Sequence, residues 1–165
     1  MVMSDVLCRM KELAVDSVNP HLMTIATLTG HAVRAMGPAY SIIMDNGPAR
    51  QKNTAQAVQA VGHECGDPFE ISTLRREDYE FHTDTSDYAE ILQANTRPST
   101  MTNRGHQGPG AFLVMASGLD KHGIDSSQPL PYSHLDIAGS AGNYPDIPTA
   151  APVVALTSHF VLNKA

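Results

Sequence analysis

Short apolar runs and amphipathic stretches alternate along the chain, and turn-forming residues separate them. Apolar positions recur at helical spacing after Ser4, which is expected to cap a first helix. This helix should end before Asn19-Pro20, because the residue before a proline disfavours the helical conformation. Two short apolar runs, residues 22–26 and 40–44, have the length of buried strands. Residues 69–72 are expected to form a short strand, and residues 133–137 a further buried strand in which apolar and polar positions alternate. Strands made almost wholly of apolar residues indicate a sheet that is covered on both faces.

Further helices are predicted between and after these strands. The expected segments are residues 31–36, 48–63, 86–94, 111–119 and 150–162, with Thr149 as the cap of the last one. Residues 73–102 are otherwise polar and are expected to be loop, which in a compact domain is commonly a functional or interaction surface. The order of strands and helices predicts an α/β fold in a single domain over residues 1–165. Its expected form is a three-layer α/β/α arrangement around a mostly parallel or mixed central sheet.

The composition narrows the class of protein. Among 165 residues, 42% are hydrophobic and 17% are charged, which suits a globular domain. The formal net charge is −6, with no basic run and no Trp, so a nucleic acid or an anionic membrane is not expected as a partner. No apolar stretch approaches the ~20 residues that span a bilayer, and no signal-peptide pattern opens the chain. Cys8 and Cys65 form no CxxC pair, which favours a reducing, cytoplasmic location.

One turn stands out as a candidate binding site. The predicted strand at residues 22–26 ends in Thr27-Leu28-Thr29-Gly30 and continues as a short predicted helix. In open α/β sheets, ligands bind beside such a turn, at the carboxyl end of the strand. The spacing alone fits a purely structural turn equally well.

Two other features are candidates for chemistry. The glycine-rich residues 104–110 precede a predicted helix and could hold an anion through backbone N–H groups, although they lack the Lys-Ser/Thr pair of a P-loop. This leaves a small-molecule-binding domain as one alternative. His134 and Asp136 share a strand face and could form part of a metal site, but a histidine that orients a buried neighbour by a hydrogen bond is the simpler interpretation. The sequence contains no HExxH motif and no Gly-x-Ser-x-Gly elbow.

Three segments resemble motifs of the leucyl aminopeptidase (cytosol aminopeptidase) family. Residues 26–30, ATLTG, resemble the family's ATLTGA; residues 132–139, YSHLDIAG, resemble its WAHLDIAG; and residues 2–7 resemble its LADAL helix opening. The three matches follow the family order and span most of the chain. The resemblance implies the carboxyl-terminal part of the family's catalytic domain, with the segments that end at Gly30 and Gly139 side by side and open to a common cleft.

Enzymes of this family are metallo-aminopeptidases, which remove the first residue of a peptide substrate with the help of two divalent ions, Zn or Mn. The family's metal ligands include residues of NTDAEGR and KGITFD-like segments, and neither segment occurs in these 165 residues. The family's N-terminal domain is missing as well. We therefore assign no catalytic or metal-binding residue, and expect the chain to supply the substrate-pocket half and to be inactive and without bound metal in isolation.

The residues that carry over from the family are those on the substrate side. The resemblance implies substrate-binding roles for Thr27, Leu28, Gly30, Ala138 and Ala141. His31 stands where the family usually has a small residue, and some members carry a larger apolar residue at the position of Ala141. The preference for a substrate side chain therefore stays open.

A second interpretation is a non-catalytic scaffold or assembly module. Intact members of the family form hexamers, which implies a homo-oligomer, and residues 73–102 could contact neighbouring subunits. The two interpretations differ in whether the full gene encodes intact Lys, Asp and Glu metal ligands.

Overall fold

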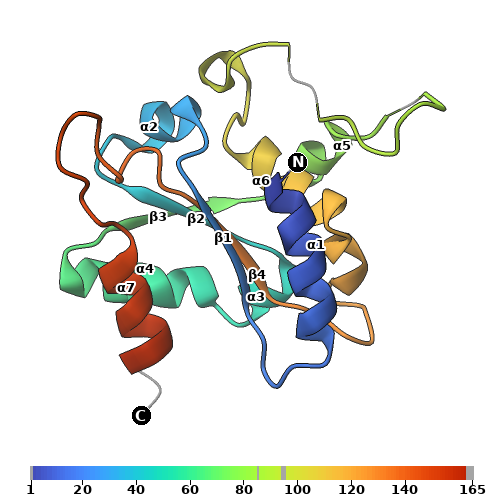
Figure 1. Ribbon diagram of the computed structural model, residues 1–165, viewed down its shortest axis with the longest axis horizontal. Coiled ribbons are helices and arrows are strands. Elements are labelled where there is room, and N and C mark those ends of the chain that lie inside the picture. Colours follow the sequence, from blue (N-terminus) through green and yellow to red (C-terminus); the bar gives the residue numbers. More distant parts are fainter. Residues whose placement is uncertain (1, 85, 94–95, 163–165) are drawn as a thin grey trace.

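A four-stranded sheet forms the centre of the computed structural model, which describes residues 2–84, 86–93 and 96–162 (Figure 1). The strands are β1 (Leu22–Ala26), β2 (Ser41–Asp45), β3 (Phe69–Thr73) and β4 (Tyr132–Asp136), in the spatial order β1-β4-β2-β3. β1 runs parallel to β4 and β2 runs parallel to β3, whereas β2 and β4 are antiparallel. The predicted mixed, mostly parallel sheet is confirmed, and each strand lies within one residue of its expected position.

Helices cover both faces of the sheet (Figure 1). α1 (Val2–Val15) and α6 (Gln107–Ala116) lie on one face, and α4 (Thr54–Cys65) and α7 (Val153–Thr157) lie on the other. Successive residues of β2 point to opposite sides, so Ile42 belongs to the core cluster under α1 and α6, and Ile43 to the cluster under α4 and α7. The two separate cores confirm the three-layer α/β/α arrangement. No helix in residues 2–84, 86–93 and 96–162 is both long and apolar enough to cross a bilayer.

Several helix boundaries differ from the sequence-based expectation. Ser4 lies inside α1 and does not cap it. The single helix expected over residues 48–63 is two helices, α3 (Gly47–Gln51) and α4, because Asn53 adopts a left-handed conformation with φ of 55° between them. α7 begins at Val153, and Thr149 does not cap it; the Thr149 hydroxyl donates to the carbonyl of Ser140. α7 continues as the π-helical segment η3 (Ser158–Leu162).

The helix expected over residues 86–94 is wrong. Residues 86–93 contain no helix, and Ala94 lies outside the described residues. Thr83 and Ile91 instead form an antiparallel bridge, and the backbone of Ser86 donates to the carboxylate of Asp84. Such side-chain bonds to nearby backbone stabilise turns at the expense of helix. The surrounding segment, expected to be loop, also contains the helix α5 (Arg76–Glu80) and the 3-10 turn η1 (Ser99–Met101).

The glycine-rich stretch is not an open anion cradle. α6 begins at Gln107 rather than Ala111, so Gly108 and Gly110 lie inside the helix. A Cβ atom at Gly105 would collide with the carbonyl oxygen of Ser99 and stand 3.0 Å from the Cβ of His31. Close packing therefore explains Gly105 without an anion, and the small-molecule-binding alternative stays a prediction. The remaining short helices are α2 (Gly30–Met36) and η2 (Leu119–His122).

Candidate functional site

The two family-like motifs meet at one end of the sheet. β1 and β4 are parallel neighbours with Ala26 paired to Asp136, so their carboxyl ends lie side by side. The pairing continues for one further step, because the backbone N–H of Ile137 donates to the carbonyl of Ala26 at 2.9 Å. Residues 27–30 and 137–140 therefore leave the sheet together, as the resemblance implied.

A buried carboxylate joins the two segments. Asp136 has no exposed surface, and its Oδ1 accepts the backbone N–H groups of Leu28 and of Ala138, each at 3.1 Å. Its Oδ2 accepts the hydroxyl of Thr29 at 2.6 Å. The Thr29 hydroxyl in turn accepts the N–H of Ala32 and caps α2. Asp136 thus fixes the turn after β1, the segment after β4 and the start of α2 through one side chain.

His134 lies on the same strand face as Asp136 but binds different partners. Its Nδ1 is 2.7 Å from the hydroxyl of Thr24, which is 2.6 Å from the hydroxyl of Tyr132. Burial lowers the pKa of His134 to about 4, so the ring is neutral at pH 7. His134 therefore orients a buried neighbour, and within the described part of the chain no three His, Cys, Asp or Glu side chains form a group that could hold a metal ion.

Leu28 faces a pocket of about 610 Å³. Its apolar lining comes from α1, α6 and the segment after α5, and includes Met3, Phe81, Phe112 and Leu113. Leu28 itself is 42% exposed, which places a large apolar side chain at the mouth of an apolar pocket. The lining also includes polar residues such as Asp78, His82 and Arg104, so the pocket offers both apolar surface and hydrogen-bonding groups, as small-molecule and peptide sites do.

The other four candidate residues do not line this pocket. Thr27 and Gly30 are exposed on the turn, and a Cβ atom at Gly30 would stand 2.9 Å from the Cγ2 of Thr100. Ala138 packs against the core cluster below α1 and α6, and Ala141 is held through its backbone N–H, which donates to the carbonyl of Ile137. Ala138 still belongs to the same structural unit as Leu28, because the two backbone N–H groups share one carboxylate oxygen of Asp136.

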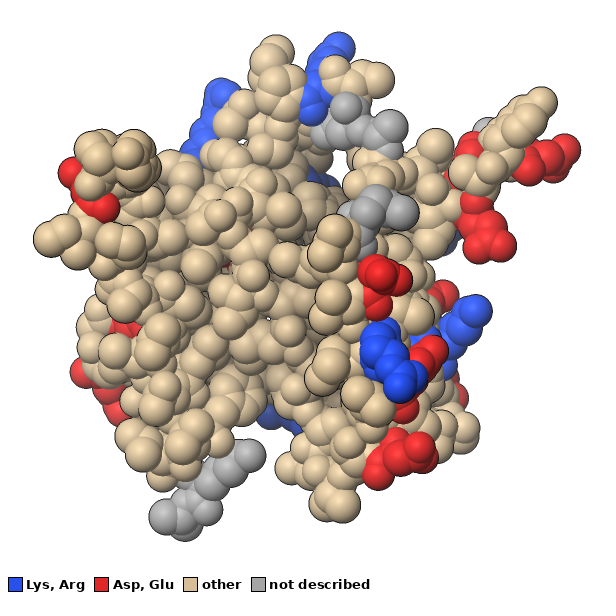
Figure 2. All heavy atoms as spheres, in the orientation of Figure 1, with Lys and Arg blue, Asp and Glu red and all other residues tan. Residues whose placement is uncertain are grey.

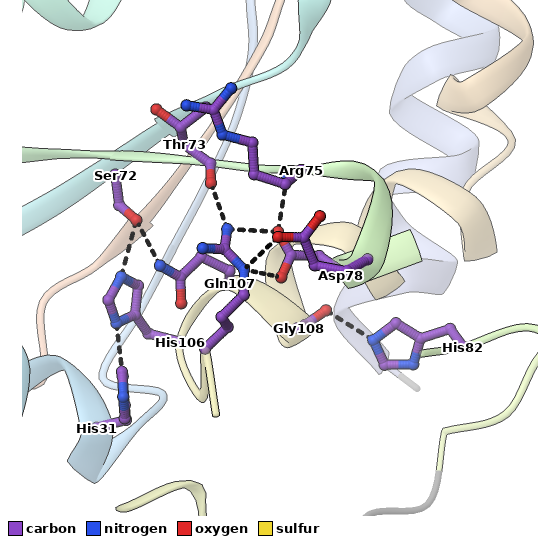
Figure 3. A network of polar contacts seen from close by, with 11 residues as sticks. His31, Ser72, Thr73, Arg75, Asp78, His82, His106, Gln107 and Gly108 are labelled. Atoms are coloured by element: carbon purple, nitrogen blue, oxygen red, sulfur yellow. Dashed lines mark hydrogen bonds and ion pairs between the residues drawn. The ribbon is translucent and has the colours of Figure 1, made fainter. Parts of the chain in front are cut away.

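An ion pair that the sequence did not indicate forms one wall of the pocket (Figure 3). The guanidinium of Arg104 binds the buried carboxylate of Asp78 through Nε at 2.6 Å and Nη2 at 2.7 Å, and Nη2 also donates to the carbonyl of Thr73. The carboxylate of Asp78 raises the pKa of Arg104. This pair connects α5, the end of β3 and the loop before α6. No local spacing indicates it, since 26 residues separate the partners.

Two histidines form a second unpredicted contact (Figure 3). Nδ1 of His31 lies 2.8 Å from Nδ1 of His106, whose Nε2 lies 2.9 Å from the hydroxyl of Ser72. His106 is buried, and burial lowers its pKa to about 4. The ring of His31 packs against Gly105, so the large residue at position 31 is accommodated by the missing side chain at position 105.

Comparison with known proteins agrees with the three motifs. The catalytic domain of the cytosol aminopeptidase family matches residues 1–157. The putative aminopeptidase W07G4.4 of Caenorhabditis elegans is 49% identical over 162 residues, which are 98% of this chain and 31% of the relative's length. The chain therefore spans less than a third of that relative. Because the match extends over nearly the whole sequence, the chain belongs to the cytosol aminopeptidase family and corresponds to part of its catalytic domain.

Proposed function

We propose that this chain is the substrate-pocket part of a metal-dependent aminopeptidase that removes the first residue of a peptide. The observation that carries the proposal is the position of Leu28. Its backbone is fixed by the buried carboxylate of Asp136, and its side chain lines the apolar pocket of about 610 Å³. Thr27 and Gly30 on the same turn, and Ala138 and Ala141 after β4, complete the proposed substrate-binding set.

In this proposal the peptide binds to a turn that is already ordered. The bonds of Asp136 to Leu28 and Thr29 hold the backbone before substrate arrives, so little conformational entropy is lost on binding. An apolar substrate side chain in contact with Leu28 would leave water, and full burial of a leucine-sized side chain is worth about 1.5–3 kcal/mol. This is enough to distinguish an apolar first residue from glycine.

The hydrolytic step does not fit the residues described here. The family's two divalent ions, zinc or manganese, activate water when bound. Among residues 2–84, 86–93 and 96–162 no cluster suits such a pair, since Asp136 is engaged by four donors and His134 is buried. We propose that the metal ligands belong to other parts of the full catalytic domain and that the chain alone is inactive.

The first test is hydrolysis of leucine 4-nitroanilide by the purified 165-residue chain. With Zn²⁺ or Mn²⁺ added, we expect no release of nitroaniline above the rate of the same sample treated with a chelator, because no residue set here generates hydroxide near pH 7. A matched sample of an intact family aminopeptidase controls for the substrate and the metal. Hydrolysis by the chain that disappears with chelator would contradict the proposal.

Assembly into a homo-oligomer, such as the family's hexamer, belongs to the same proposal. Residues 83–84 and 86–91 extend away from the body of the molecule (Figure 1), and Tyr88 on this segment is 97% exposed. We propose that this exposed segment contacts another chain in the oligomer. A non-catalytic assembly module would use the same surface. Intact metal ligands in the full-length protein would favour the enzyme, and substituted ligands would favour the assembly module.

We also propose a cytosolic location, which the free thiols of Cys8 and Cys65 favour.

A further inference from the structure

A second hollow lies beside the Leu28 pocket. It is a groove of about 680 Å³ between α2 and residues 100–104, and it shares Thr102, Asn103 and Arg104 with the pocket. His31 and Arg34 line its α2 side. No acidic residue lines the groove among the described residues, although the whole chain carries a formal charge of −6. In Figure 2 the upper edge of the molecule shows Lys or Arg atoms, while Asp and Glu gather mainly on the right-hand side.

The groove carries about one net positive charge. Arg104 is neutralised by its bidentate pair with Asp78. Arg34 has no such partner: its Nη1 donates to the backbone carbonyl of Thr100 at 3.0 Å, and no carboxylate of the described residues lies within ion-pair distance of it. A guanidinium binds carboxylates and phosphates through parallel N–H groups. One net charge matches a monoanionic carboxylate better than a dianionic phosphate.

Polar contacts also hold the ring of His31 (Figure 3). The amide of Gln107 donates to the hydroxyl of Ser72 at 3.0 Å, and this hydroxyl lies 2.9 Å from Nε2 of His106. Nδ1 of His106 lies 2.8 Å from Nδ1 of His31, so one of the two rings donates to the other. Burial lowers the pKa of His31, which favours its neutral form. In the arrangement where Nδ1 of His31 accepts from His106, the neutral ring of His31 carries its proton on Nε2.

We propose that this groove binds a carboxylate, held by the guanidinium of Arg34 and the Nε2–H of His31. Asn103 and the hydroxyl of Thr100 lie at the same groove and can complete the contacts. Because the groove and the Leu28 pocket share three residues, the carboxylate is that of a short peptide whose apolar side chain occupies the pocket. This choice of ligand rests on the proposed function, whereas the carboxylate site itself does not. His31, which follows the turn of residues 27–30, would then favour peptides that carry a carboxylate close to the side chain in the Leu28 pocket.

The test uses the full 165-residue chain and three small probes. N-acetylglycine carries a terminal carboxylate, N-acetylglycinamide carries none, and the α-amide of N-acetylglutamic acid carries only a side-chain carboxylate. Binding is followed by NMR through the ring resonances of His31 and the side-chain resonances of Arg34. We expect saturable shifts with both carboxylates and none with N-acetylglycinamide. Either carboxylate binding supports the site, and the tighter of the two identifies a peptide terminus or an acidic side chain as its source.

Two variants with the same change of charge make the test specific. Arg34→Gln should weaken carboxylate binding about ten-fold or more, because a hydrogen-bonded charge is lost. Arg9→Gln, which removes an exposed arginine paired with Glu12 on α1, should leave binding unchanged. Arg34→Lys retains the charge and should recover part of the affinity, which separates binding from any loosening of residues 100–104.

Three results would overturn the proposal: equal shifts with N-acetylglycinamide, unchanged binding by Arg34→Gln, or tighter binding of inorganic phosphate than of N-acetylglycine. Leu28→Ala should not alter N-acetylglycine binding, since this probe has no apolar side chain. A result against carboxylate binding in the groove can therefore be distinguished from a result against side-chain binding in the Leu28 pocket.

Discussion

Replacement of Asp136 by alanine should lower the free energy of unfolding by about 3–5 kcal/mol. The change leaves the N–H groups of Leu28 and Ala138 and the hydroxyl of Thr29 without their common acceptor at a fully buried position. Each lost bond to a charged group costs about 1.5–3 kcal/mol, and partial hydration of the loosened turn recovers some of this. Urea denaturation of the purified variant measures the loss.

The Asp136→Asn variant separates the hydrogen bonds from the charge. Its amide oxygen can still accept from Leu28 and Ala138, and its NH2 group can donate to the Thr29 hydroxyl, so we expect a smaller loss than for Asp136→Ala. Asp16→Ala, at an exposed position, is the matched control and should change stability by less than about 0.5 kcal/mol. A loss below about 1 kcal/mol for Asp136→Ala would show that the turn does not depend on this carboxylate.

Stability should fall steeply as the pH decreases from about 6.5 towards 4. The pKa values of His21, His106 and His134 are lowered from 6.5 to about 4 in the folded chain, mainly by burial. In this window the unfolded chain binds protons that the folded chain excludes, so acid favours unfolding, and the stability is fully present only above pH 6.5. Each histidine contributes a slope of up to about 1.4 kcal/mol per pH unit, which gives roughly 4 kcal/mol per unit for the three.

Urea denaturation at pH 7, 6, 5.5 and 5 checks this dependence. His106→Gln should reduce the slope by about a third, because glutamine does not titrate. His63→Gln changes an exposed histidine on α4 and should leave the slope as it is in the unmodified chain. A stability that is flat between pH 7 and 5, or a slope that His106→Gln does not change, would contradict the assignment of these buried neutral rings.

β1 and β2 could be predicted from sequence because each overlaps a short apolar run, and β4 because apolar and polar residues alternate along it. The face shared by His134 and Asp136 follows from the two-residue period of a strand. The helices were less predictable where one residue decides the boundary, as Asn53 does by separating α3 from α4. Residues 86–93 have a helix-like apolar spacing, but bonds from Asp84 to the turn at Ser86 stabilise another conformation.

The side-chain contacts of the candidate site could not be predicted from local sequence patterns. Asp136 lies 108 residues from Leu28, and only the pairing of β1 with β4 brings them together. His31 and His106 are 75 residues apart, and their contact depends on a small residue at Gly105. The resemblance to the family supplied the turn and its neighbour, but not the side chain that connects them. Long-range partners of this kind follow from topology, which a single sequence specifies only indirectly.

The central claim is that Leu28, whose backbone is held by Asp136, lines a pocket for an apolar side chain of a peptide. NMR titration of the chain with L-leucinamide, compared with glycinamide, tests it most directly. We expect shifts at the Leu28 methyl groups and the amides of Leu28, Thr29 and Ala138, with leucinamide bound about ten-fold more tightly than glycinamide and the preference lost in Leu28→Ala. Equal binding of the two amides, or shifts confined to other parts of the molecule, would contradict the claim.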